Sequence, residues 1–101
     1  MTNAAVEAFR RTLSGSAPPP ESDLALQALW WAGKNEWDRA HNCAQQHEGD
    51  PACDLVHAHL HRQEGDMANA AYWYRRAGKP VPSTALPVEW DDIAAGLFAR
   101  P

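Results

Sequence analysis

The chain has 101 residues, of which 45% are hydrophobic, and its formal net charge is −4 at neutral pH. This length and composition fit one folded domain with a single modest core and exclude a disordered chain. Because an acidic chain lacks the basic surface that replaces phosphate counterions, we expect no nucleic-acid partner. With no long apolar run and no signal-peptide pattern, we expect no membrane partner and a cytoplasmic location.

The first helix signal lies near the N-terminus. A helix is predicted at residues 3–13, because Val6, Phe9 and Leu13 recur at i, i+3 and i+7 and form one apolar stripe. A linker is predicted at residues 14–21, where consecutive prolines favour an extended chain. Strand signals are missing throughout the sequence, which predicts an all-α domain.

Two helical hairpins are expected next. The first spans residues 22–48 and contains helices at about 23–33 and 36–47, with Ser22 as the N-cap of its first helix. Apolar residues cover almost all sides of that first helix, which predicts that it is buried on several sides or carries an interface.

The second hairpin spans residues 50–78 and has the clearest boundaries in the chain. The letters EGDP at 48–51 supply a glycine for a helix end, an aspartate N-cap and a proline for the next first turn. Helices are therefore predicted at 51–64 and 67–77, joined by a Gly-Asp turn at 65–66 in which Asp66 is the N-cap of the second helix.

A last helix is predicted at residues 87–99. It begins at Pro87, and Trp90, Ile93 and Leu97 repeat at i, i+3 and i+7. We expect this helix and the N-terminal helix to cap the stack, because two repeats are too few to enclose a core. Self-association into a homodimer is another way to cover the remaining apolar surface.

The two hairpins form an internal repeat, and the second copy resembles the tetratricopeptide (TPR) or Sel1-like helical repeat. Residues 24–47 superpose on residues 54–77, with small residues at matching positions where the helices of a hairpin approach closely. The residues that carry the resemblance are the Gly65-Asp66 turn, the small Ala70 and Ala77, the aromatic Tyr74 and the following Pro82.

Three residues depart from the family pattern, since Asp54, His57 and His61 stand where the family has an aromatic, a leucine and a tyrosine. The block LHRxEGDxxNAxYWYRRAG also resembles a group of small uncharacterised bacterial proteins.

The resemblance implies a right-handed α-α superhelix that acts as a non-enzymatic module binding a protein or peptide. The first helices of the hairpins would line a concave ligand-binding surface with Leu29, Leu55, His59 and Arg62. The guanidinium of Arg62 would suit a peptide with an anchoring side chain and a carboxylate. The alternative is an ordinary solvated face. Trp30 is a candidate for a second interface or a contact with a capping helix.

Four residues around the EGDP turn suggest an alternative function, a small zinc-binding or metal-stabilised helical protein. Cys43 and His47 precede the turn, and Cys53 and His57 follow it, each pair spaced i, i+4. An antiparallel hairpin would place His47 opposite Cys53 and Cys43 opposite His57, giving four ligands for a tetrahedral ion. The simpler interpretation has no metal and no other cofactor, with plain core cysteines and hydrogen-bonded histidines.

Enzyme signatures are missing, because the sequence has no phosphate-binding glycine loop, no GxSxG and no HExxH motif. We therefore expect a protein that is not an enzyme. A third hypothesis is a catalytic centre of His57, His61 and Glu64, which requires both imidazoles to be accessible in a cleft.

Overall fold

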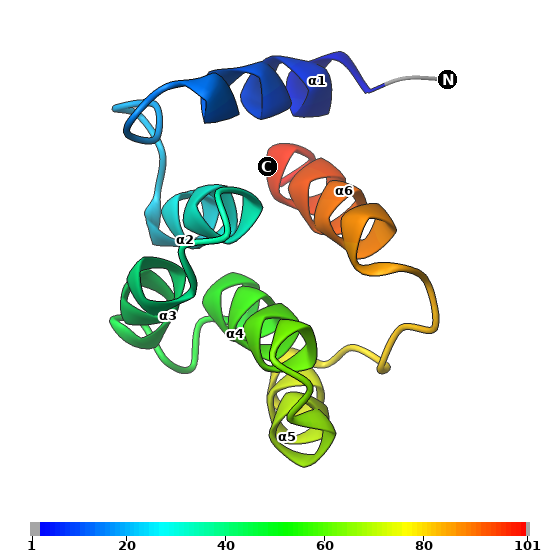
Figure 1. Ribbon diagram of the computed structural model, residues 1–101. Helices are drawn as coiled ribbons and strands as arrows, with labels where there is room; N and C mark the ends of the chain where they lie inside the picture. Colours follow the sequence, from blue (N-terminus) through cyan, green and yellow to red (C-terminus); the bar gives the residue numbers. More distant parts are fainter. Residues whose placement is uncertain (1–2, 101) are drawn as a thin grey trace.

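The structure is a computed structural model that describes residues 3–100. Over these residues it contains helices and no strand, which confirms the predicted all-α class (Figure 1). None of the helices in this range is long and apolar enough to cross a bilayer. The elements are α1 (Ala4–Arg11), the 3₁₀ turn η1 (Thr12–Ser14), α2 (Leu24–Gly33), α3 (Trp37–Gln45), α4 (Pro51–Gln63), α5 (Met67–Ala77) and α6 (Leu86–Phe98).

Aspartate side chains cap three of the four hairpin helices, α2, α4 and α5. Asp50 and Asp66 cap α4 and α5 as predicted, each accepting a hydrogen bond from the backbone N–H three residues further on. For α2 the prediction of Ser22 is wrong, because Asp23 accepts from the backbone N–H of Leu26 at 3.0 Å. The carbonyl of Ser22 accepts from the side-chain amide of Gln27.

The same left-handed backbone conformation occurs in both hairpin turns, although the residues differ. Gly65 follows α4 with φ of 84°, and Asn35 follows α2 with φ of 60°. Asparagine tolerates this conformation better than most residues because its short polar side chain can hydrogen-bond locally. The first copy thus has Asn35-Glu36 where the second has Gly65-Asp66, and the sign of φ is the same in both turns.

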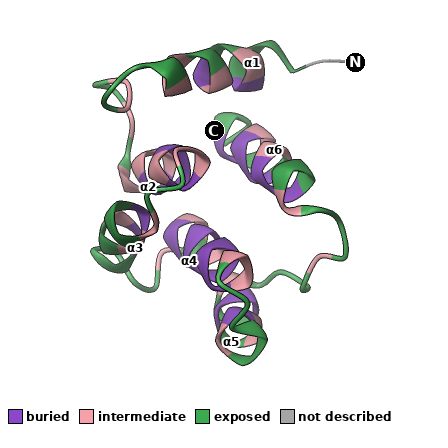
Figure 2. Cartoon of the chain, in the orientation of Figure 1, coloured by how far each residue is buried: buried purple, intermediate pink, exposed green. Residues whose placement is uncertain are grey.

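Helix α4 is the centre of the structure. Every residue from Cys53 to His61 is buried except Leu55. Helix α2 packs on α3, α4 packs on α5, and α4 also contacts α2, α3 and α6 (Figure 1). Figure 2 shows the buried residues of α2, α4 and α6 on the sides that face one another.

The position of α6 differs from the capping position expected for the last helix. Instead of lying against one end of the stack, α6 packs on α2 and α4, the first helices of the two hairpins, and α1 packs on α6 (Figure 1). Two indole groups link these elements: Trp90 donates to the carbonyl of Leu29 at 2.8 Å, and Trp30 donates to the hydroxyl of Thr12 at 2.9 Å.

Two glycine substitutions separate backbone conformation from packing. A Cβ atom at Gly65 or at Gly96 would meet no atom within 4 Å, but only Gly65 has positive φ. We expect Gly65→Ala to lower the free energy of unfolding by about 1–2 kcal/mol. Gly96→Ala, within the exposed side of α6, should raise it by about 0.5–1 kcal/mol. Urea denaturation followed by circular dichroism measures both changes. A change of the same sign in the two variants would contradict the assignment of Gly65 to a strained backbone conformation and of Gly96 to an ordinary helical one.

Candidate functional site

The surface predicted to bind a peptide is covered by α6. Leu29 and His59 are fully buried, Leu55 is half-buried, and the side chain of Arg62 is 13% exposed. Leu29 and Leu55 contribute to the hydrophobic core. The structure therefore brings these four residues to the face formed by α2 and α4, as expected, but this face is not open.

A buried carboxylate on α6 is the partner of two of the predicted binding residues. Glu89 is 4% exposed and lies 2.7 Å from Nδ1 of His59, while Nη1 of Arg62 donates to it at 2.9 Å. The hydroxyl of Tyr74 also donates to Glu89, and Arg62 donates a further hydrogen bond to the carbonyl of Thr84. The carboxylate expected in a bound peptide is thus supplied by the chain itself.

These hydrogen bonds determine the ionisation of the network. Burial alone would raise the pKa of Glu89, but the hydrogen bonds from His59, Tyr74 and Arg62 outweigh burial and hold this pKa below its ordinary value. Burial and the neighbouring carboxylate raise the pKa of Tyr74, so its hydroxyl remains a donor. Glu89 is therefore an ionised acceptor at neutral pH.

The four candidate zinc ligands do not converge within residues 3–100. Ligand atoms of His47 and Cys53 lie within 4.8 Å of each other and of Asp50, but Cys43 and His57 lie outside this group. The prediction assumed that the helix before the turn reaches His47, whereas α3 ends at Gln45. His47 is therefore not on a helical face with Cys43.

The two thiols favour the protonated form. Burial raises the pKa of Cys43, and burial together with a hydrogen bond to Asp50 raises the pKa of Cys53 to about 12. Zinc binds the thiolate form of cysteine. These side chains behave as the small core residues of the simpler interpretation.

His57 instead belongs to a cluster of three histidines between α3 and α4. One ring nitrogen from each of His41, His57 and His61 lies within 4.8 Å of the other two. The ring centroids are 4.5 Å apart for His41 and His57 and 4.9 Å apart for His57 and His61. Two indoles enclose the cluster, since Trp37 stacks on His41 at 4.7 Å and Trp73 stacks on His57 at 3.8 Å.

The hydrogen bonds in this cluster leave ring nitrogens free. Nδ1 of His61 lies 2.6 Å from a carboxylate oxygen of Glu64, which orients the ring and leaves its Nε2 available. Nδ1 of His57 is buried and has no hydrogen-bond partner. In residues 3–100, the other buried side-chain nitrogen or oxygen without a partner is Nε2 of His59.

Two imidazoles of the cluster, His41 and His57, have pKa values that are lowered from the ordinary value. Burial, followed by the charges of His41, His61 and Arg76, lowers the pKa of His57 to about 4. Burial and the neighbouring His61 also lower the pKa of His41, partly opposed by the carboxylate of Glu64. Both shifts favour the uncharged imidazole at these two residues.

The sequence predicts His57 and His61 as a pair but does not predict that His41 joins them. Its only signal is the i, i+4 spacing from Trp37, and nothing in the spacing indicates that α3 places it against α4. His57 and His61 are 3% and 6% exposed, so the accessible cleft required by the hypothesis of a catalytic centre with Glu64 is missing at these residues.

Neither a family model, nor a curated protein, nor a solved structure matches this chain. The tetratricopeptide resemblance therefore stays a prediction.

Acidification tests the buried network. Because the pKa of Glu89 in the folded protein lies below its ordinary value of 4.5, its contribution to stability is complete above that pH. The contribution is lost as the pH falls through the lower folded value. We expect Glu89→Gln to lower the free energy of unfolding by about 3 kcal/mol at neutral pH, since it leaves Arg62 without its carboxylate.

The difference in stability between the wild type and Glu89→Gln should shrink as the pH falls below 4.5. Urea denaturation over a series of pH values measures it. Asp92→Asn removes an exposed carboxylate from the same helix and is the matched control. A difference that stays constant with pH would contradict the assignment of an ionised Glu89.

Proposed function

We propose that this protein binds a divalent transition metal ion of the zinc class at His41, His57 and His61. The observation that carries the proposal is the convergence of three ring nitrogens within 4.8 Å of one another, one from each residue. The buried Nδ1 of His57, which has no partner, supports it independently, because a buried polar atom normally has one.

The distances suit a metal ion after small ring rotations. Around a tetrahedral zinc with Zn–N bonds of about 2.1 Å, the ligand nitrogens are about 3.4 Å apart. The three nitrogens lie within 4.8 Å of one another, so the rings would have to rotate slightly to bring them to this spacing. Three imidazole ligands suit zinc, copper, nickel or iron rather than magnesium or calcium. The fourth position would be occupied by water.

The surroundings favour a structural or sensing role over hydrolysis. Trp37 and Trp73 cover the cluster from α3 and α5, and Glu64 orients His61 from the end of α4. A metal ion at this place would link the two hairpins, so that its binding free energy would contribute to folding. The helical repeat then serves as the scaffold that brings together ligands from different hairpins.

Titration of the metal-free protein with Zn²⁺ tests the proposal. We expect one ion per chain by isothermal titration calorimetry. A free zinc concentration one hundredfold above the Kd should raise the free energy of unfolding by about 2.7 kcal/mol. His41→Ala should abolish binding, and Glu64→Gln should weaken it by about 10–100-fold, because it removes the group that orients His61.

Two controls make this result specific. His47→Ala removes an exposed histidine outside the cluster and should leave the affinity unchanged. Replacement of zinc by Co²⁺ distinguishes the ligand sets, since Cys43 or Cys53 would add a thiolate charge-transfer band in the near ultraviolet. Full zinc binding by His41→Ala, or a thiolate band, would overturn the proposal.

A second candidate is the binding module suggested by the tetratricopeptide resemblance. The observation that favours it is that α6 already occupies the face of α2 and α4 with an anchoring indole, Trp90, and a carboxylate, Glu89. An anchoring side chain and a carboxylate are what the sequence leads us to expect in a peptide that binds beside Arg62. A partner protein with an equivalent segment would bind by displacing α6.

A synthetic peptide of residues 84–100 tests this second candidate. The Glu89→Gln protein, whose own α6 is weakened, should bind the peptide more tightly than the wild type does, because an attached segment competes at high effective concentration. A peptide with glutamine at position 89 should bind at least about tenfold more weakly, since a hydrogen-bonded charge contributes about 1.5–3 kcal/mol. Fluorescence anisotropy measures both, and equal affinities would contradict the candidate.

A further inference from the structure

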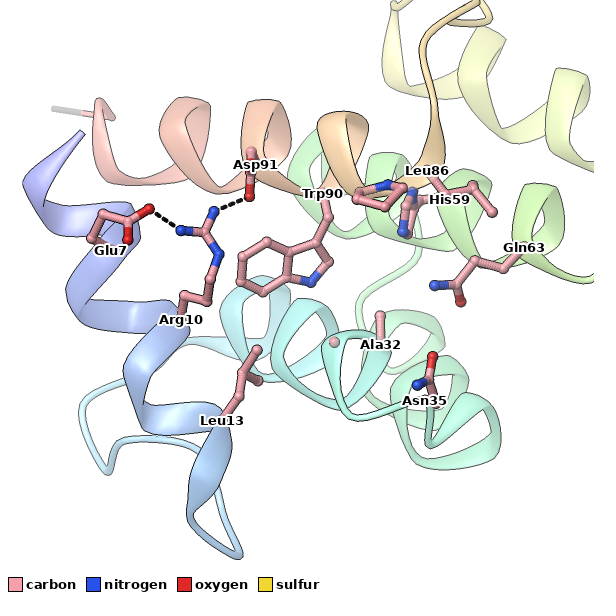
Figure 3. Close-up of a pocket in the computed structure, with 12 residues that line it drawn as sticks. Glu7, Arg10, Leu13, Ala32, Asn35, His59, Gln63, Leu86, Trp90 and Asp91 are labelled. Carbon is pink, nitrogen blue, oxygen red and sulfur yellow. Dashed lines mark hydrogen bonds and ion pairs between the residues drawn. The ribbon is translucent and has the colours of Figure 1, made fainter. Parts of the chain in front are cut away.

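A pocket lies where α1, α2, α4 and α6 meet. Its volume is about 580 Å³, within the range of small-molecule sites. Figure 3 shows side chains from all four helices around it. The pocket is separate from the histidine cluster, because His57 and His59 are two residues apart and therefore point about 200° apart around α4.

The feature that makes this pocket a binding site is the imidazole of His59, which forms part of its wall (Figure 3). Glu89 is ionised and accepts from every neighbour, so Nδ1 of His59 carries the hydrogen of that contact. Because Arg62 already balances the charge of Glu89, the ring donates through Nδ1 and its Nε2 is the acceptor. It is buried and has no partner in the protein. A ligand that donates to it would supply the missing hydrogen bond.

The rest of the lining is mainly apolar. The indole of Trp90 and the side chains of Leu13, Ala32, Leu86 and Pro87 form its walls. The Nε1 donor of Trp90 is already used by the carbonyl of Leu29, so the indole offers the pocket only its apolar ring. Such walls suit a flat, largely apolar body.

The charges at the pocket argue against an anionic ligand. Arg10 is the cation of the lining, and it forms ion pairs with both Glu7 and Asp91 (Figure 3). These three side chains together carry one excess negative charge. A phosphate or carboxylate group would therefore meet no available cation here and would be repelled by the excess charge.

We propose that this pocket binds a small uncharged aromatic alcohol, whose hydroxyl donates to Nε2 of His59 while its ring lies against Trp90. The ligand needs a hydrogen-bond donor because Nε2 of His59 is an acceptor without a partner. It needs an aromatic body because the walls of the pocket are mainly apolar. It is uncharged because Arg10 is already paired with Glu7 and Asp91.

Three probes of similar shape test the proposal on the full-length protein: phenol, anisole, which lacks the donor, and benzoate, which carries a charge. Saturable shifts of the Trp90 indole and Gln63 amide signals in ¹H–¹⁵N spectra report binding, and the Trp73 indole is the internal reference. We expect phenol to bind at least tenfold more tightly than either of the other probes.

Two variants locate the site. His59→Asn keeps a donor for Glu89 but removes Nε2, and it should weaken phenol binding at least tenfold while leaving anisole unchanged. Gln63→Trp places an indole at the edge of the pocket and should block phenol, whereas Gln45→Trp, at an exposed site on α3, should not.

Equal affinity for phenol and anisole, tighter binding of benzoate, or unchanged phenol binding by Gln63→Trp would each overturn the proposal. If His59→Asn does not fold, two other results test the proposal. One is the ratio of phenol to anisole affinity for the wild type, and the other is the comparison of Gln63→Trp with Gln45→Trp. Failure of zinc binding would leave this test unaffected, because no ligand of the metal site is part of it.

Discussion

The arrangement of the helices depends on one buried carboxylate. Glu89 has to be ionised and paired, because burying an unpaired carboxylate is among the most unfavourable events in folding. Its three donors come from two helices, with His59 and Arg62 on α4 and Tyr74 on α5. All three can be satisfied only when α6 lies on α4 in one register. The carboxylate therefore determines which face of the hairpins is covered and how the ring of His59 is oriented.

The two unpaired nitrogens of α4 have a common cause. A helix that is buried on almost every side normally consists of apolar residues, yet α4 carries histidines at 57, 59 and 61. Each of these rings has two nitrogens, and the protein satisfies one nitrogen of His59 and one of His61 through carboxylates. Because buried polar atoms normally have hydrogen-bond partners, these positions are where we infer ligands that the protein does not itself supply.

The sequence predicted local structure better than the arrangement of the helices. The boundaries of α4 and α5 and the aspartate caps at 50 and 66 follow from turn and capping residues that act over a few positions. Ser22 and Asp23 are both good caps, and only the backbone conformation decides between them.

The sequence indicates that the guanidinium of Arg62 suits a carboxylate, and in the structure Arg62 does donate to one. That this carboxylate is Glu89, and that His41 joins His57 and His61, depends on contacts between distant segments, which periodicity within one helix does not encode.

The contact between the first and last helices changes how such a molecule should unfold. In an open array of repeats each unit touches only its neighbours, so one end can separate while the other remains folded. Here α1 packs on α6, and α6 packs on both α2 and α4, which closes the chain into a ring of contacts. Loss of any one helix exposes the core of the others. We therefore infer that the domain melts in one cooperative transition.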